Sequence, residues 1–265
     1  MGGQKAMTYV MSDIHGNAAR FYSVMRQIEL QPEDTLYVLG DVIDRYPDGI
    51  RLLRLLMRMP NARLLLGNHE YMMLNALDWP GQAASDELRA LRLWYRNGGD
   101  VTHAYLKHIR RSIRREIFDY LRTLPLNLEI GINGQQYLLV HGGVLDRYCD
   151  HTDRYDNPEH YAVWYRMACT EPELEGKTII FGHTHTSRYQ PNNPLEIWRS
   201  PGGGKIGIDC GCSFPPPQPR EHAPVYGRLA CLRLEDGRVF YSEEALPEKP
   251  APPVWQAGQR AALPV

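Results

Sequence analysis

Short apolar runs alternate with helix-like segments in the N-terminal part of the chain. The runs occupy residues 7–11, 35–39 and 63–66, and their length is typical of buried strands. Between them, residues 18–28 read as a helix, and residues 50–57 carry apolar side chains at helical spacing. Strands that alternate with helices indicate βαβ units around a largely buried sheet.

The pattern becomes helical and strongly basic over residues 86–122 and then returns to strands. Its arginine cluster is Arg110, Arg111, Arg114 and Arg115. A solvated helix face is the simplest interpretation of this cluster, and a docking surface for an acidic partner is the alternative. The later strand-like runs are residues 126–132, 136–140, 178–181, 206–209, 225–234 and 239–242.

Turn and linker signals suggest how the chain is organised. Asn133-Gly134, between the first two of these later runs, predicts a tight hairpin. No repeat or linker divides the chain, so we expect a single domain over residues 1–246. A Pro/Ala-rich tail follows over residues 247–265.

Composition narrows the class of protein. With 265 residues, 43% of them hydrophobic and 23% charged, the chain can bury an ordinary globular core. The 30 Lys and Arg nearly balance the 31 Asp and Glu, so we expect no specific nucleic-acid binding. No stretch is long and apolar enough to span a membrane, and the five cysteines form no even framework. A cytoplasmic protein with reduced thiols and no membrane partner is therefore expected.

Polar side chains follow five successive strand-like runs. In open α/β sheets, ligands bind beyond the carboxyl ends of the strands. Each polar group alone is weak evidence, because Asp-x-His is often only a turn and a single His often only a hydrogen-bonding residue. Together they indicate a metal site, and its candidate residues are Asp13, His15, Asp41, Asp44, Asn68, His69, His141, His183 and His185.

These motifs resemble those of the calcineurin-like metallophosphoesterases. They are Asp13-x-His15, Gly-Asp-x-x-Asp-Arg at 40–45, Gly-Asn-His-Glu at 67–70, His-Gly-Gly at 141–143 and Gly-His-Thr-His at 182–185. Arg45 makes the series similar to the phosphoprotein phosphatase branch, in the style of small bacterial and phage serine/threonine protein phosphatases. The resemblance implies an α/β (α+β) fold, in which a β-sandwich of mixed sheets is flanked by helices. It places the active site at the carboxyl ends of strands.

The resemblance also implies two divalent transition-metal ions, with Mn expected and Fe or Zn as alternatives. Asp13, His15 and Asp41 would hold the first ion. Asp41 would bridge to the second, which Asn68, His141 and His183 complete. His185 would add a ligand to the first ion, or else merely line the pocket. Such a pair lowers the pKa of bound water toward ~7, and hydroxide then attacks phosphorus directly.

The same resemblance assigns catalytic roles. His69 would protonate the leaving alkoxide and would be oriented by Asp44. Arg45 and Arg166 would grip the phosphate, together with Asn68, because a guanidinium can bond two oxygens at once. Tyr46-Pro47 stands where a glycine usually follows the arginine, and this change leaves the substrate in doubt. Residues 94–99 and Thr102 resemble a helical segment of the family and are interpreted as packing and capping residues.

Two substrates remain open from the sequence. The first is phosphoserine or phosphothreonine in a protein or peptide. The alternative is a dinucleoside polyphosphate, such as a bis(5'-nucleosyl)-tetraphosphate. A scaffold without activity would show gaps in the ligand set, which is complete. A nucleic-acid phosphodiesterase is disfavoured by the charge balance and by Arg45.

Overall fold

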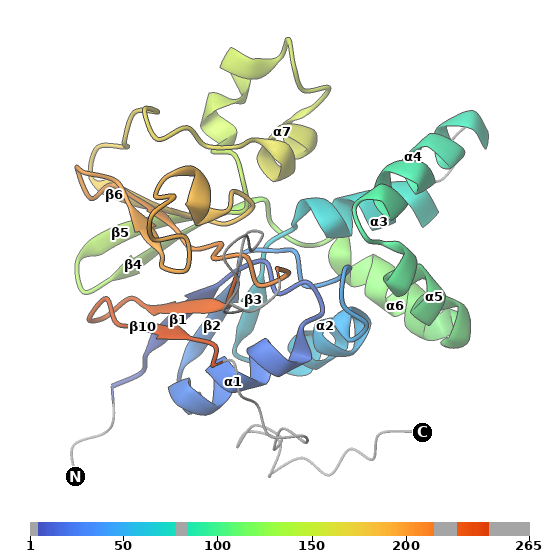
Figure 1. Cartoon of the computed structure of the whole chain (residues 1–265), viewed down its shortest axis with the longest axis horizontal. Helices are drawn as coiled ribbons and strands as arrows, with labels where there is room; N and C mark the ends of the chain where they lie inside the picture. The colour runs from blue at the N-terminus through green and yellow to red at the C-terminus, as the bar shows by residue number, and fades with distance from the viewer. Residues whose placement is uncertain (1–4, 78–83, 215–226, 244–265) are drawn as a thin grey trace.

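The computed structural model describes residues 5–77, 84–214 and 227–243, and these form two packed β-sheets flanked by helices (Figure 1). The first sheet has the order β10-β9-β1-β2-β3, with β1 to β3 parallel and β9 antiparallel to β1. Its strands are β1 (Thr8–Met11), β2 (Thr35–Val38), β3 (Ala62–Leu64), β9 (Ala230–Arg233) and β10 (Val239–Tyr241).

The second sheet has the order β4-β5-β6-β8-β7 and is also mixed. Strands β5, β6 and β8 run parallel, while β4 and β7 lie antiparallel at the two edges. Its strands are β4 (Asn127–Ile132), β5 (Gln135–Val140), β6 (Lys177–Phe181), β7 (Trp198–Arg199) and β8 (Lys205–Gly207). Two mixed sheets flanked by helices confirm the fold expected from the motifs.

Alternation along the central strands places apolar side chains on both faces of each sheet. Val10 belongs to the apolar cluster shared by the two sheets, whereas its neighbours Tyr9 and Met11 belong to the cluster that includes the helices. In β5, Leu139 joins the shared cluster, and Leu138 packs on the opposite side. Successive side chains of a strand point to opposite faces, so each apolar run contributes to the cluster between the sheets and to the cluster on the other face of its sheet.

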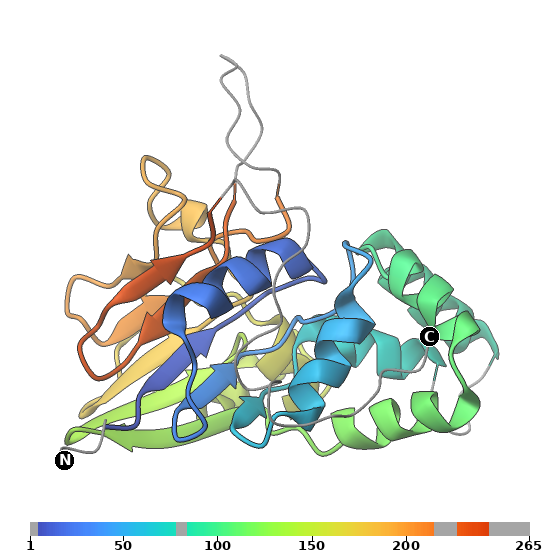
Figure 2. The same cartoon turned by 90° about the horizontal axis from the view of Figure 1, so that it is seen from below.

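Helices α1 (Ala18–Ile28) and α2 (Gly49–Arg58) cover the outer face of the first sheet (Figure 2). The side-chain oxygen of Asn17 accepts a hydrogen bond from the backbone N–H of Arg20 at 3.1 Å and caps α1. Every boundary of these two helices lies within one residue of the boundary expected from the sequence.

A lobe of helices stands beside the sheets in both views (Figures 1 and 2). It comprises α3 (Asn68–Leu77), α4 (Ala84–Arg96), α5 (Asp100–His108) and α6 (Arg111–Leu121). The single helical region expected over 86–122 is therefore three helices, broken at residues 97–99 and 109–110. Arg110, Arg111 and Arg115 are exposed and Arg114 is half-buried, which fits either a solvated face or a docking surface.

Several short elements were not predicted from the sequence. They are η1 (Leu145–His151), α7 (Pro158–Trp164), η2 (Thr186–Arg188) and β7.

The predicted hairpin is confirmed, since Asn133 and Gly134 both have positive φ and lie between the paired residues Ile132 and Gln135. The run expected over 225–234 forms a strand only at β9. Residues 225–226 and the tail at 247–265 lie outside the described residues. Within the described part, no helix has the length and apolar character needed to cross a membrane.

Candidate active site

One pocket of about 240 Å³ gathers most of the polar residues predicted from strand ends. It lies where the carboxyl ends of the parallel strands in the two sheets meet, because each of these strands is followed within a few residues by a polar side chain. The predicted residues that line it are Asp13, His15, Asp41, Arg45, Asn68, Arg166, His183 and His185. His69 and His141 are buried behind this lining and contact it, and Asp44 is buried behind His69.

The backbone of the site is strained. Among the described residues, eight non-glycine positions have positive φ, and six of them belong to the predicted site, with φ between 50° and 72°. Left-handed backbone costs a non-glycine residue about 1–3 kcal/mol and persists where the surroundings enforce it. Strain is therefore concentrated at the residues that carry the candidate chemistry, which are Asp13, His15, Asp41, Asp44, Arg45 and His183.

Two glycines bring the loops after β2 and β3 into contact. A Cβ on Gly40 would lie 2.5 Å from the Cα of Gly67, so neither loop tolerates a side chain there. The loop after β1 is tied to the same place, because the backbone N–H of His15 donates to the carbonyl of Asp41 at 2.8 Å. These contacts place Asp41 at the centre of the site.

Glu70 fixes the loop that carries Asp41. Its buried carboxylate accepts hydrogen bonds from the backbone N–H groups of Asp41 and Val42 at 2.9 Å, and of Ile43 and Gly67 at 3.2 Å. A carboxylate has enough lone pairs for all four donors. The sequence motif included Glu70, but sequence reasoning gave it no role.

The hydrogen bonds of His141 indicate a cation site. Its Nδ1 lies 2.6 Å from the carbonyl oxygen of Leu39, which assigns the ring proton to Nδ1. The lone pair of Nε2 then faces two acceptors, Oδ1 of Asn68 at 3.0 Å and Oδ1 of Asp41 at 3.5 Å. Acceptors that converge without a donor are favourable only around a cation, so this arrangement fits a metal ion.

His15 and His183 repeat the arrangement. Nδ1 of His15 lies 3.3 Å from the carbonyl of Ile43, and its Nε2 faces Oδ2 of Asp41 at 3.8 Å. Nε2 of His183 lies 3.2 Å from the carbonyl of Trp164, which leaves Nδ1 for the site. Burial lowers the pKa of both His15 and His183 well below the usual value. Both rings are therefore neutral, as metal ligands must be.

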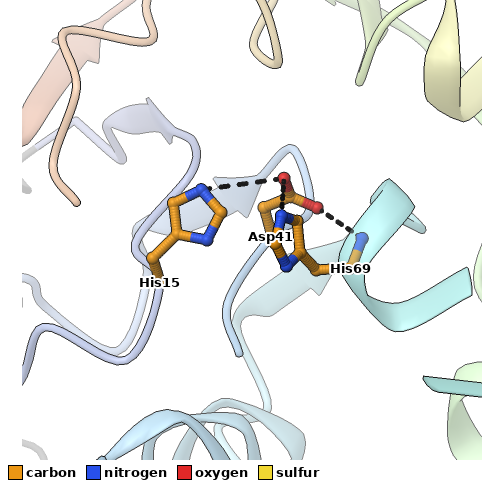
Figure 3. A group of neighbouring side chains, drawn as sticks. All are labelled: His15, Asp41 and His69. Carbon is orange, nitrogen blue, oxygen red and sulfur yellow. Dashed lines mark hydrogen bonds and ion pairs between the residues drawn. The ribbon is translucent and has the colours of Figure 1, made fainter. Parts of the chain in front are cut away.

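Two groups of side chains could each hold a metal ion, and Asp41 belongs to both. One group is Asp41, His141 and His183, which are three of the four residues predicted from the sequence for the second ion. The other is His15, Asp41 and His69, whose ring nitrogens point toward the carboxylate of Asp41 (Figure 3).

The sequence placed Asp13, and not His69, in the first metal group. Oδ1 of Asp13 lies 3.9 Å from Nε2 of His15, while its Oδ2 accepts the backbone N–H of His183 at 3.0 Å. Nε2 of His69 lies 3.3 Å from a guanidinium nitrogen of Arg45. A positive group at that distance opposes a second cation on the same nitrogen, and this favours the predicted set.

His69 and Asp44 form a buried pair. Nδ1 of His69 lies 2.7 Å from Oδ2 of Asp44, and the indole Nε1 of Trp94 donates to the same oxygen at 2.8 Å. Burial raises the pKa of Asp44 to about 7 and lowers the pKa of His69 to about 4. Trp94 was interpreted from the sequence as a packing residue, and the structure adds this hydrogen bond to that role.

Arginines contribute to the lining of the pocket. Nη1 of Arg45 donates to the hydroxyl of Ser213 at 2.6 Å, and Nη1 of Arg166 donates to the carbonyl of His183 at 2.7 Å. Both residues are exposed and line the pocket, and their binding of phosphate stays a prediction. Arg188 also lines it, and the sequence gave no signal for that residue.

Asp209 is a further lining residue that sequence reasoning overlooked. It follows β8 as the other acidic residues follow their strands, so the same signal could have found it. Burial and the nearby charge of Asp13 raise the pKa of Asp209 to about 6. His185 lies nearby, with Nδ1 2.5 Å from the hydroxyl of Ser187. Its Nε2 is buried without a hydrogen-bond partner among the described residues, so ligation by His185 stays a prediction.

Comparison with solved structures agrees with the fold. The metallophosphoesterase from Sphaerobacter thermophilus superposes with a TM-score of 0.50 at 19% identity, over 92% of this chain and 89% of that one. A cold-active protein-tyrosine phosphatase of a psychrophilic Shewanella gives 0.53 at 17% identity, over 91% and 81%. A protein proposed to be a diadenosine tetraphosphatase gives 0.57 at 20% identity, over 91% and 95%.

Sequence comparison identifies relatives with two kinds of name. Serine/threonine-protein phosphatase 1 of Salmonella typhimurium is 32% identical over 50% of this chain and 57% of its own length. The symmetrical bis(5'-nucleosyl)-tetraphosphatase of Chromobacterium violaceum is 28% identical over 52% of this chain and 43% of its own. The chain spans about half the length of these curated relatives.

The motifs, the shared carboxylate and the fold agree with the family comparison. Residues 7–187 match the family model described as calcineurin-like phosphoesterase, which covers well over half of the chain. Members of this family are hydrolases that use divalent metal ions, and the two groups around Asp41 are candidate sites for them. The chain therefore belongs to the calcineurin-like phosphoesterase family.

Proposed function

We propose that the protein is a phosphomonoester hydrolase with two metal ions that removes phosphate from phosphoserine and phosphothreonine in proteins. The observation that carries this proposal is the position of Arg45, which lines the pocket and lies 3.3 Å from Nε2 of His69. A guanidinium there can bond the non-bridging oxygens of a terminal phosphate, whose charge exceeds that of a diester. The similarity to a serine/threonine phosphatase supports the same substrate class.

Side chains of this chain would hold the two ions as predicted from the sequence. The first would lie among Asp13, His15 and Asp41, and the second among Asp41, Asn68, His141 and His183. When bound, two such cations polarise phosphoryl oxygens and lower the pKa of water, which supplies a nucleophile at neutral pH. We expect Mn, with Fe or Zn as alternatives, because carboxylate, imidazole and amide ligands suit all three.

Side chains of the protein would orient the phosphate and protonate the leaving group. Arg45 and Arg166 would orient the phosphate so that the attacking oxygen and the leaving alkoxide lie in line. As the bond from phosphorus to the alkoxide breaks, Nε2 of His69 would donate a proton to it.

The proton on His69 would depend on bound substrate. Burial keeps the pKa of His69 low in the free protein, so the ring is neutral there. A phosphate dianion within about 4–6 Å favours the protonated ring, because opposite charge raises the pKa of a histidine. Asp44 would balance the positive charge from the other side of the ring, through the contact at Nδ1.

A second candidate function is hydrolysis of a dinucleoside polyphosphate. Trp164 and Phe214 both line the pocket and could stack on a nucleobase. The similarity to symmetrical bis(5'-nucleosyl)-tetraphosphatases supports it as well.

A direct substrate comparison tests the proposal. The purified protein, loaded with Mn, is assayed for kcat/KM on a phosphoserine peptide, a phosphothreonine peptide and diadenosine tetraphosphate. Asp41→Asn, prepared in the same way, serves as the control for contaminating hydrolases. We expect a peptide to be preferred, whereas a preference of about tenfold or more for the dinucleotide would replace the first proposal by the second.

A further inference from the structure

Trp94 and His69 donate to the same oxygen of Asp44. The indole Nε1 lies 2.8 Å from Oδ2 and Nδ1 of His69 lies 2.7 Å from it. The other oxygen of Asp44, Oδ1, is buried and has no hydrogen-bond partner among the described residues. His69 and Trp94 are thus the donors at Oδ2, and neither belongs to the lining of the pocket.

The indole of Trp94 is held rigidly. The side chain is fully buried, and a Cβ on Gly99 would lie 2.3 Å from its Nε1. The ring stacks on His103 at a centroid distance of 5.7 Å, and Nδ1 of His103 lies 2.6 Å from the hydroxyl of Tyr95. Packing on both sides of the ring fixes the direction of the indole N–H, so this N–H can hold the carboxylate of Asp44 in one orientation.

The turn between α4 and α5 also supports the strained backbone at the site. Asp44 and Arg45 have φ of 72° and 66°, which non-glycine residues rarely adopt. The backbone N–H of Asp44 donates to Oγ1 of Thr102 at 3.1 Å, and that of Arg45 donates to the carbonyl of Gly98 at 3.0 Å. One corner of the helical lobe thus contacts both residues through the backbone and Asp44 through its side chain.

We propose that Trp94 is a positioning residue, whose indole N–H orients the carboxylate of Asp44 so that His69 is aligned for proton transfer. The inference rests on the proposed role of His69 as the proton donor. It assigns to the α4–α5 corner a function beyond packing: this corner holds Asp44 against the buried side of His69 and Arg45 in the lining of the pocket.

Trp94→Phe tests the hydrogen bond, because phenylalanine keeps an aromatic ring and removes the N–H. We expect kcat on a phosphoserine peptide, which has a poor leaving group, to fall by about 10- to 100-fold, as for the loss of a hydrogen bond to a charged group. On p-nitrophenyl phosphate, whose leaving group needs little protonation, the fall should be under about threefold. Trp198→Phe, a change to another buried tryptophan in β7 away from the site, should leave both rates unchanged.

Two further measurements distinguish positioning from packing. In the Asp44→Asn background, Trp94→Phe should add no further loss, because the acceptor is already altered. In the metal-free protein, the nuclear magnetic resonance signal of the His69 Nδ1 proton should shift in Trp94→Phe and stay in place in Trp198→Phe. Equal losses on both substrates, additive losses in the double variant or an unmoved proton signal would each reduce Trp94 to a packing residue. If His69→Asn itself shows no dependence on the leaving group, the proposed function fails instead.

Discussion

Nη2 of Arg45 lies 3.3 Å from Nε2 of His69, and Nδ1 of the same ring lies 2.7 Å from Asp44. The histidine is thus held between a carboxylate behind it and a guanidinium at the pocket. A phosphate bound by Arg45 would place its leaving group next to Nε2. This relationship links substrate binding to proton donation and gives the variants of both residues distinct expected effects.

Arg45→Ala should weaken phosphomonoester hydrolysis without removing metal. Loss of a bidentate donor to the developing charge should lower kcat/KM for a phosphopeptide by about 10²- to 10³-fold. Arg45→Lys should recover only part of it, because a point charge does not reproduce the two-pronged contact. Hydrolysis of bis-p-nitrophenyl phosphate, a diester, should change much less. Equal effects on monoester and diester would contradict the monoesterase assignment.

Asp41→Asn and His69→Asn should fail in different ways. Asp41 belongs to both candidate metal groups, so its variant should lose bound metal as well as activity. His69→Asn should keep its metal while kcat on a phosphopeptide falls by about 10²- to 10⁴-fold. Elemental analysis of bound metal, together with kcat on the phosphopeptide for each variant, distinguishes loss of metal from loss of the proton donor. Loss of metal in His69→Asn would instead support His69 as a ligand of the first ion.

Protein purified in buffer supplemented with Mn should contain close to two metal ions per chain. The expectation follows from Asp41, whose two oxygens face different histidines, Oδ1 toward His141 at 3.5 Å and Oδ2 toward His15 at 3.8 Å. A chelator should abolish activity, and added Mn should restore it. Full activity at one ion per chain or fewer would rule out the binuclear proposal.

Two of the five cysteines should react with a thiol reagent in the folded protein. Cys149 and Cys169 are exposed, whereas Cys210, Cys212 and Cys231 are buried, and all five are free. Burial raises the pKa of Cys212 to about 12, and it also raises the pKa of Cys210 and Cys231. The thiolate is the reactive form, so the three buried thiols should stay unreactive even at a pH of about 9. Guanidinium-unfolded protein should show all five thiols, as the control.

The sequence predicted those parts of the site that local rules control. Asp13, Asp41 and His183 follow the ends of strands within three residues, and Asn133-Gly134 can form a tight hairpin without help from the rest of the chain. Asp209 follows β8 in the same way, but was read as the end of a strand and given no role.

Other features depend on tertiary packing and leave no local signal. The hydrogen bond from Trp94 to Asp44 joins residues 50 positions apart and exists only because the helical lobe packs on the loop after β2. Arg188 enters the pocket from the short helix η2, whose three residues carry no periodicity. Strand β7 has two residues and is defined only by its partner β8.

Glu70→Gln should destabilise the protein even without metal. The carboxylate of Glu70 accepts four backbone N–H groups from the loops around Asp41, while a glutamine offers one oxygen and adds two N–H donors that face those same groups. Buried donors left without acceptors should lower the free energy of unfolding by about 1–3 kcal/mol each, so a lower midpoint of thermal unfolding is expected in the chelated protein. Glu129→Gln, which alters an exposed pair with Lys177 at 2.6 Å, should cost less than about 1 kcal/mol.

Glu70→Gln should also bind Mn more weakly in a titration, because the loop that carries Asp41 would be held less firmly in this variant. Glu129→Gln should bind Mn normally. An unchanged unfolding midpoint together with unchanged Mn affinity would show that Glu70 does not support the loop.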